Sequence, residues 1–198
     1  MTKHVELGEM VKKALAGAFS LVKNDIGSDA KLSAKGTTME TESYEISGFG
    51  HFCILRMHAM MGLMKMETAI LAPFEKELPL MNLDWVQAMG KETQIIEYYD
   101  DREADFERTL MQSFKDSGKG KTEAFHRKVS AELEAFLEKT VAAQPADPAK
   151  KAERVRRFAE NLFASDGPAV HQVVKLFGEK TAHRLVVKHM YGIWDFTD

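Results

Sequence analysis

The sequence predicts an α+β fold built around a methionine-rich antiparallel β-sheet. Between residues 36 and 100, polar and apolar residues alternate with the two-residue period of β-strands. Before and after this segment, apolar residues recur every three to four positions, as they do on one face of an α-helix. The links between the expected strands are too short for a parallel crossover, so neighbouring strands should pair antiparallel.

The first half of the chain is expected to supply one helix and then the strands. Residues 5–24 carry an apolar stripe with helical spacing, which predicts an amphipathic opening helix. Strand periodicity begins at Gly36, and it is interrupted at Gly62, at Gly90 and in the segment 73–79. The strands that follow the first are expected at residues 51–60, 64–73, 80–87 and 92–99.

The second half of the chain returns to the helical period, which predicts one-sided helices packed on the sheet. Asp147 and Pro148 are typical of an N-cap and a first helical position. The expected helices lie around residues 106–114, 125–141, 148–163 and 166–178, with a last one through about residue 190.

Composition and charge narrow the classes of function. The 198 residues suit a single domain, residues 1–198. The net charge of −3 gives no basic excess of the kind that binds phosphates, so neither nucleic acid nor membrane is an expected partner. Cys53 is the only cysteine, and no apolar run approaches the ~20 residues that span a bilayer. We therefore expect a cytoplasmic protein.

Two apparent motifs do not carry a function. Residues 118–122 end like a phosphate-binding P-loop, but Lys115 stands where that motif needs its first glycine, so a solvated loop is the better interpretation. The seven histidines form no metal-ligand pattern, and we expect no metal site. The expected strands therefore hold the candidate functional residues.

Several polar residues fall within the expected strands. By strand alternation, Arg56 and His58 share one face of their strand, and Asn82 and Asp84 share one face of theirs. Asp84 has large apolar neighbours, so burial should raise its pKa towards a range useful for proton transfer. Glu67 is equally consistent with a carboxylate that faces solvent.

Methionines cluster in the same strands, among them Met64 and Met66. Flexible filling of the core is the simpler interpretation of this cluster. The alternative is an adaptable apolar wall for a large, flat ligand.

Two groups of residues resemble a known family. The segments 72–74 (APF), 77–80 (ELPL) and 83–86 (LDWV) resemble, in this order, the central strands and proline loop of the ferredoxin-dependent bilin reductases. The segments 158–161 (FAEN), 173–179 (VVKLFGE) and 190–196 (MYGIWDF) resemble the final helices of that family.

The resemblance implies a fold, an activity and partners. The fold would be a three-layer α/β/α sandwich, with a tetrapyrrole held between the antiparallel sheet and the C-terminal helices. Electrons would arrive singly from ferredoxin or flavodoxin, and protein carboxylates would donate protons to the bilin. No cofactor would be bound intrinsically, because the family uses no flavin, metal or nicotinamide.

The resemblance also implies site residues. The family's catalytic aspartate falls on Asp84. Its histidine falls on Glu67 counted back from Asp84 and on Thr68 counted back from Pro73, and we choose Glu67 because threonine is no proton donor. The aspartate before the C-terminal helix falls within one position of Asp166, which is equally consistent with a plain N-cap. His58 is a possible substitute for a further glutamate of the family.

We therefore expect a bilin-reductase-like oxidoreductase that reduces a linear or open-chain tetrapyrrole. A non-catalytic binding or carrier protein for a similar flat hydrophobic ligand is the alternative, and an interaction domain without a ligand is a third possibility. The basic residues within 150–157 are a candidate docking patch for an acidic redox protein. The expected catalytic residues are Asp84, Glu67, His58 and Asp166, and the expected substrate-binding residues are Arg56, Met64, Met66 and Asn82.

Overall fold

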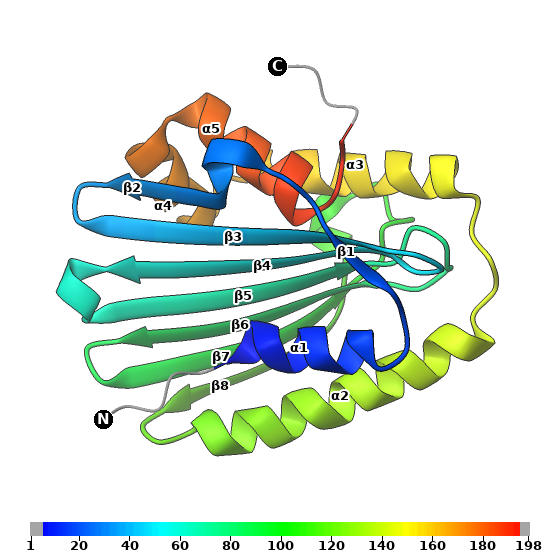
Figure 1. Cartoon of the computed structure of the whole chain (residues 1–198), viewed down its shortest axis with the longest axis horizontal. Helices are drawn as coiled ribbons and strands as arrows, with labels where there is room; N and C mark the ends of the chain where they lie inside the picture. Colours follow the sequence, from blue (N-terminus) through cyan, green and yellow to red (C-terminus); the bar gives the residue numbers. More distant parts are fainter. Residues whose placement is uncertain (1–5, 195–198) are drawn as a thin grey trace.

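The computed structural model describes residues 6–194 and has an eight-stranded antiparallel β-sheet at its centre (Figure 1). The strand order is β1-β3-β4-β5-β6-β7-β8, and β2 pairs with β3 beside β1. The strands are β1 (Leu21–Lys23), β2 (Lys31–Ala34), β3 (Thr37–Ile46), β4 (Gly50–Ala59), β5 (Met64–Ala72), β6 (Leu80–Ala88), β7 (Lys91–Tyr99) and β8 (Leu110–Gly118).

Helices cover both faces of the sheet, which gives the expected three-layer α/β/α sandwich (Figure 1). We call the two faces the α1/α2 face and the C-terminal face. The α1/α2 face packs against α1 (Leu7–Ala16) and α2 (Thr122–Ala142). The C-terminal face packs against α3 (Pro148–Ala164), α4 (Pro168–Phe177), α5 (Glu179–His183) and the π-helix Arg184–Met190. Short 3₁₀ helices lie at Gly27–Ala30, Met60–Gly62 and Phe106–Arg108.

A separate apolar core fills each side of the sheet. On the α1/α2 face, Leu7, Val11 and Leu15 of α1 are fully buried against sheet residues such as Phe52. On the C-terminal face, Val155 and Phe158 of α3 pack with Tyr191 and with sheet residues. Successive side chains along each strand thus contribute to the two cores in turn.

The sequence predicts the central strands and most helices correctly. The expected strands match β4, β5, β6 and β7 to within one or two residues. At the start of α3, Asp147 accepts hydrogen bonds from the backbone N–H groups of Ala149 and Lys150, so it is the predicted N-cap.

Three expectations about the edges of the sheet are wrong. The opening helix ends at Ala16, and Leu21 pairs with Ile46 as part of β1. The segment expected as a helix at 106–114 is mostly β8, because Leu110 and Phe114 are spaced for one face of a strand as well as for a helix. β2 also forms before Gly36, where strand periodicity was expected to begin.

No helix within residues 6–194 is both long and apolar enough to cross a membrane.

Candidate functional site

A cavity of about 200 Å³ lies between the C-terminal face of the sheet and the helices that cover it. Its floor consists of side chains from β4 to β7, including Met66, Thr68, Asn82, Asp84 and Glu97. Its helical wall consists of apolar side chains and one phenol. These residues are Leu162, Val170, Val173, Val186, Met190 and Tyr191.

Asp84 is the central carboxylate of this cavity. Thr68 lies directly across from it in the register of β5 and β6, and its hydroxyl donates a hydrogen bond to Asp84 Oδ1 at 2.5 Å. Burial raises the pKa of Asp84 to about 6, the Thr68 hydrogen bond opposes this rise, and the nearby charge of Glu97 adds to it. Asp84 is therefore a carboxyl group that exchanges a proton close to neutral pH.

Further polar groups line the cavity beside Asp84. The Tyr99 hydroxyl donates to Glu97 Oε2 at 2.6 Å, and the side-chain amide of Asn82 donates to the Tyr191 hydroxyl at 2.9 Å. Burial is the main reason that the pKa of the Tyr191 phenol is raised. Both phenols therefore stay protonated at neutral pH.

Some hydrogen-bond acceptors in this cavity lack a donor from the described part of the protein. Asn82 is buried, and within residues 6–194 its Oδ1 atom has no hydrogen-bond partner. Asp84 accepts one side-chain hydrogen bond, from Thr68. An unpaired buried acceptor is costly, so the cavity is suited to a ligand that presents N–H or O–H donors to an otherwise apolar pocket.

Local structure explains why these side chains converge. The register aligns Leu55, Thr68, Asp84 and Ile95 across four neighbouring strands, so that Thr68 and Asp84 both point to the C-terminal face. The last helix widens into the π-helix Arg184–Met190, a form that is frequent at functional sites. This helix contributes Val186 and Met190, and Tyr191 follows it directly.

Three of the predicted site residues meet at this cavity. Asp84, Asn82 and Met66 all line it. Met64 lies two residues before Met66 on the same face and packs, partly buried, against the cluster formed by Met39, Leu55, Met57 and Leu185. The methionine-rich strands thus form one side of the cavity.

Glu67, which was expected to act with Asp84, does not line the cavity. Glu67 pairs with Trp85 across the strands and points to the α1/α2 face. Its carboxylate accepts hydrogen bonds from the backbone N–H groups of Leu7 and Gly8, both at 3.0 Å, at the start of α1. Burial raises the pKa of Glu67, while these bonds and Arg56 oppose the rise.

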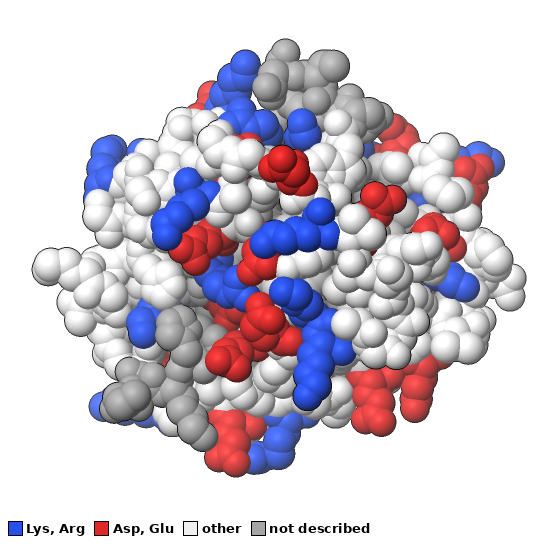
Figure 2. Space-filling model, in the orientation of Figure 1, with Lys and Arg blue, Asp and Glu red and all other residues white. Residues whose placement is uncertain are grey.

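Arg56 and His58 also lie on the α1/α2 face, because they alternate with the cavity residues of β4. Arg56 binds three carboxylates, those of Glu9, Glu42 and Glu67. Figure 2 shows the mixed basic and acidic surface near the middle of this side of the molecule. Neither residue is placed to contact a ligand in the cavity.

Asp166 lies outside the cavity. It is in the loop between α3 and α4, has a left-handed backbone with φ of 48°, and contacts His171 at 3.2 Å through its carboxylate. The N-cap position of α4 is Gly167, so the simpler interpretation of Asp166 as the N-cap is also wrong.

The basic residues of 150–157 are engaged in contacts within the protein. The Lys151 ammonium is buried and binds Asp101 and the carbonyl of Leu78. Arg154 binds Asp101 and Glu77. The remaining members also have partners: Lys150 pairs with Asp147, Arg156 with Glu153, and Arg157 with the carbonyl of Asp101. This segment is therefore less available to an acidic partner than its composition indicates.

Sequence reasoning missed several cavity residues. Thr68 was considered as the counterpart of the family's histidine. The register that pairs Thr68 with Asp84 would have placed Thr68, and not Glu67, in the cavity. Glu97 and Tyr99 lie in a correctly predicted strand, and alternation places them on one face, but the pairing of Glu97 with Asn82 was needed to place them in the cavity. Tyr191 has no comparable signal, since its position depends on the π-helix.

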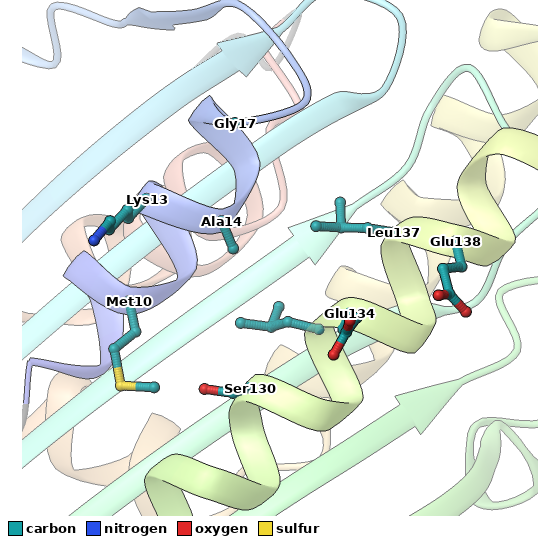
Figure 3. Close-up of a pocket in the computed structure, with 9 residues that line it drawn as sticks. Met10, Lys13, Ala14, Gly17, Ser130, Glu134, Leu137 and Glu138 are labelled. Atoms are coloured by element: carbon teal, nitrogen blue, oxygen red, sulfur yellow. The ribbon is translucent and has the colours of Figure 1, made fainter.

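A second, more open groove of about 680 Å³ lies between α1 and α2 (Figure 3). Met10, Ala14 and Leu137 give it an apolar lining, and Lys13 and Glu134 give it charges. None of the predicted site residues lines this groove, so the cavity around Asp84 remains the candidate site. Within residues 6–194, no group of three or more His, Cys, Asp or Glu side chains is arranged to hold a metal ion.

Comparisons with known proteins show the fold. No protein-family model matches the chain, and no curated protein matches its sequence. Among solved structures, it is similar to phytochromobilin synthase from tomato, determined in complex with biliverdin. The TM-score is 0.71 at 11% sequence identity, and the match covers 98% of this chain and 85% of the other. The expected α+β fold with a central antiparallel sheet is therefore confirmed, and it is similar to the fold of phytochromobilin synthase.

Proposed function

We propose that this chain binds a linear or open-chain tetrapyrrole in the cavity around Asp84 and reduces it with electrons from a small redox protein. The observation that carries the proposal is the carboxyl group of Asp84. It lies in an apolar cavity between the sheet and the C-terminal helices, and its pKa is raised to about 6. The likeness to a structure solved with biliverdin supports the ligand class.

The chemistry of the cavity is consistent with this ligand. Pyrrole N–H groups are donors, and the cavity offers Asp84 and the unpartnered Asn82 Oδ1 as acceptors. The Met66 side chain and the valines of α4 give a flexible apolar wall for a flat conjugated ligand. In this proposal, Arg56 and Glu67 hold α1 on the sheet and do not contact the ligand.

In the proposed reaction, Asp84 is the proton donor. Reduction of one double bond consumes two electrons and two protons. The electrons come one at a time from reduced ferredoxin or flavodoxin. Asp84 gives the first proton to the ligand, is reprotonated from solvent, and then gives the second proton. Glu97 is the other carboxylate that lines the cavity.

Ligand binding requires the cavity to enlarge. About 200 Å³ is less than the ~300–1,000 Å³ of typical ligand pockets. α4 is the element suited to move, because Val170 is its only buried residue and Gly178 follows it with φ of 84°. We expect α4 to shift away from the sheet when the tetrapyrrole enters.

A carrier protein for the same ligand is the second candidate. The observation that favours it is Thr68, which occupies the position beside Asp84 and is no proton donor at neutral pH. The cavity would then bind the tetrapyrrole without completing a reduction.

Biliverdin and reduced ferredoxin test both candidates. Biliverdin is first titrated into the protein while its visible absorption is recorded, and reduced ferredoxin is then added without oxygen. We expect a spectral change on binding and a second change on reduction. Binding without the second change supports the carrier, and no change on mixing contradicts both candidates.

The variant Asp84→Asn identifies the donor. It keeps the size and shape of the side chain but carries no acidic proton, so binding should persist while reduction falls by about 10²-fold or more. Asp116→Asn is the matched control, because Asp116 lies on β8 outside the cavity and pairs with Lys121. Unchanged reduction by Asp84→Asn would remove this residue from its proposed role.

A further inference from the structure

Two neighbouring turns at one end of the sheet expose large apolar side chains. The turn between β4 and β5 exposes Met60 (58%), Met61 (98%) and Leu63 (60%), and the turn between β6 and β7 exposes Met89 (78%). The backbone N–H of Met89 donates to the carbonyl of Leu63, so the two turns lie side by side. We call these four residues the methionine tip.

The backbone of the methionine tip is unusual for such residues. Met60, Met61 and Met89 all have left-handed backbones, with φ of 53°, 55° and 49°. This conformation is unfavourable for residues with a side chain, and Gly or Asn is the usual choice. The long apolar side chains at these positions point into solvent, and no packing within the described chain offsets the unfavourable backbone conformation.

Lysines surround the methionine tip. The strand register brings four loops to the same end of the sheet: the β2–β3, β4–β5 and β6–β7 turns and the β8–α2 loop. The loops carry Lys35 and Lys119, and Lys65 and Lys91 lie at the starts of β5 and β7 beside them. Residues 34–37, 60–65, 88–91 and 117–121 include no acidic residue. Within residues 6–194, no carboxylate forms a salt bridge with any of these four lysines.

We propose that the methionine tip and its lysines dock this chain on an anionic lipid membrane. Apolar side chains that project between cations match the two layers of such a surface, because methionine and leucine enter the acyl boundary while lysines bind the headgroups. The net charge of −3 gave no reason to expect this, but the charge is unevenly distributed.

The shape of the surface favours a membrane over an acidic protein. The four apolar residues sit at the ends of hairpins, and Met61 is almost fully exposed, so they project from the molecule. Such side chains can insert into a fluid bilayer surface, whereas a protein partner would need a matching pocket for each.

Docking in this way places the cavity near the membrane. Leu63 is followed by Met64 and Met66 on β5, and Met66 lines the cavity. A continuous run of apolar side chains therefore leads from the methionine tip towards the cavity. The docking proposal itself does not depend on which ligand, if any, the cavity binds.

Flotation with lipid vesicles tests the proposal on the full chain. Vesicles of phosphatidylcholine with about 30% phosphatidylserine are compared with vesicles of phosphatidylcholine alone. We expect binding to the anionic vesicles at low salt and at least tenfold weaker binding to the neutral ones. Replacing Lys91 and Lys119 together with Gln should weaken anionic binding by about tenfold or more.

A double variant, Met61→Ser with Leu63→Ser, tests the apolar part. It should abolish flotation while the circular dichroism spectrum and the melting temperature stay unchanged, because both side chains are exposed. Val141→Ser is the matched control, since Val141 is 86% exposed at the far end of α2. Equal flotation of the double variant and the wild type would overturn the proposal. Failure of the wild type to float with either vesicle would also overturn it.

Discussion

The two faces of the sheet both bury a carboxylate, but they surround it differently. On the α1/α2 face, Glu67 accepts hydrogen bonds from Leu7, Gly8 and Arg56. On the C-terminal face, Asp84 accepts one side-chain hydrogen bond, from Thr68. A carboxylate with several donors serves structure, whereas one with few donors beside a cavity retains the capacity to bind and exchange protons.

The surroundings of Glu67 and of Asp84 differ because alternate residues of a strand point to opposite faces of the sheet. Glu67 and Thr68 are neighbours in sequence and point to opposite faces of β5. Glu67 holds the first turn of α1, where backbone N–H groups carry partial positive charge. Thr68 instead adjusts the acidity of Asp84. One residue along the chain therefore separates a structural carboxylate from the candidate site.

The largest expected effect tests the structural side of this comparison. Glu67→Ala should lower the free energy of unfolding by about 3 kcal/mol, because two N–H groups and Arg56 lose a buried partner. Urea denaturation measures the change. Glu9→Ala removes another partner of Arg56 whose side chain is 49% exposed, and it should cost no more than about 1 kcal/mol. Equal losses would contradict the structural role of Glu67.

A smaller effect, with a defined pH dependence, tests the other face. Because the folded-state pKa of Asp84 is raised to about 6, the stability linked to its proton is fully present below the unfolded pKa, near 3.8. That stability is lost as the pH rises through about 6. Between pH 3 and pH 7 the wild type should therefore lose about 2–3 kcal/mol relative to Asp84→Asn. Parallel stability curves for the two proteins, measured by urea denaturation at each pH, would show that Asp84 is not perturbed.

The period of the side-chain pattern was sufficient to locate the central strands, but it did not determine how neighbouring strands pair. The period of two located strands such as β7, because one face is buried and the other is only partly covered. The edge strand β8 is largely exposed, so its weak pattern fitted a helix as well. The choice between Glu67 and Thr68 depended on the register between β5 and β6, which side-chain patterns in one strand do not determine.

Alternation within single strands predicted some of the cavity residues but not all of them. Asp84, Asn82 and Met66 share the cavity face by alternation within their own strands. Tyr191 enters the cavity directly after the π-helix, which leaves no periodic signal in the sequence. The ion pairs of Arg154 with Asp101 and Glu77 join residues more than 50 positions apart, so their effect on the basic segment needed the tertiary structure.

The smallest expected effect concerns the two carboxylates of the cavity. Glu97→Gln removes a negative charge that raises the pKa of Asp84, so that pKa should fall, by less than about one unit. Thr68→Val should move it in the opposite direction, because the Thr68 hydroxyl stabilises the charged form. Carboxyl ¹³C NMR follows the titration of Asp84 directly. The control Glu132→Gln removes a similar carboxylate, which accepts from Tyr98 on the α1/α2 face, and should leave Asp84 unchanged. A shift of Asp84 by Glu132→Gln as large as that by Glu97→Gln would mean that the sheet does not separate the two electrostatic environments.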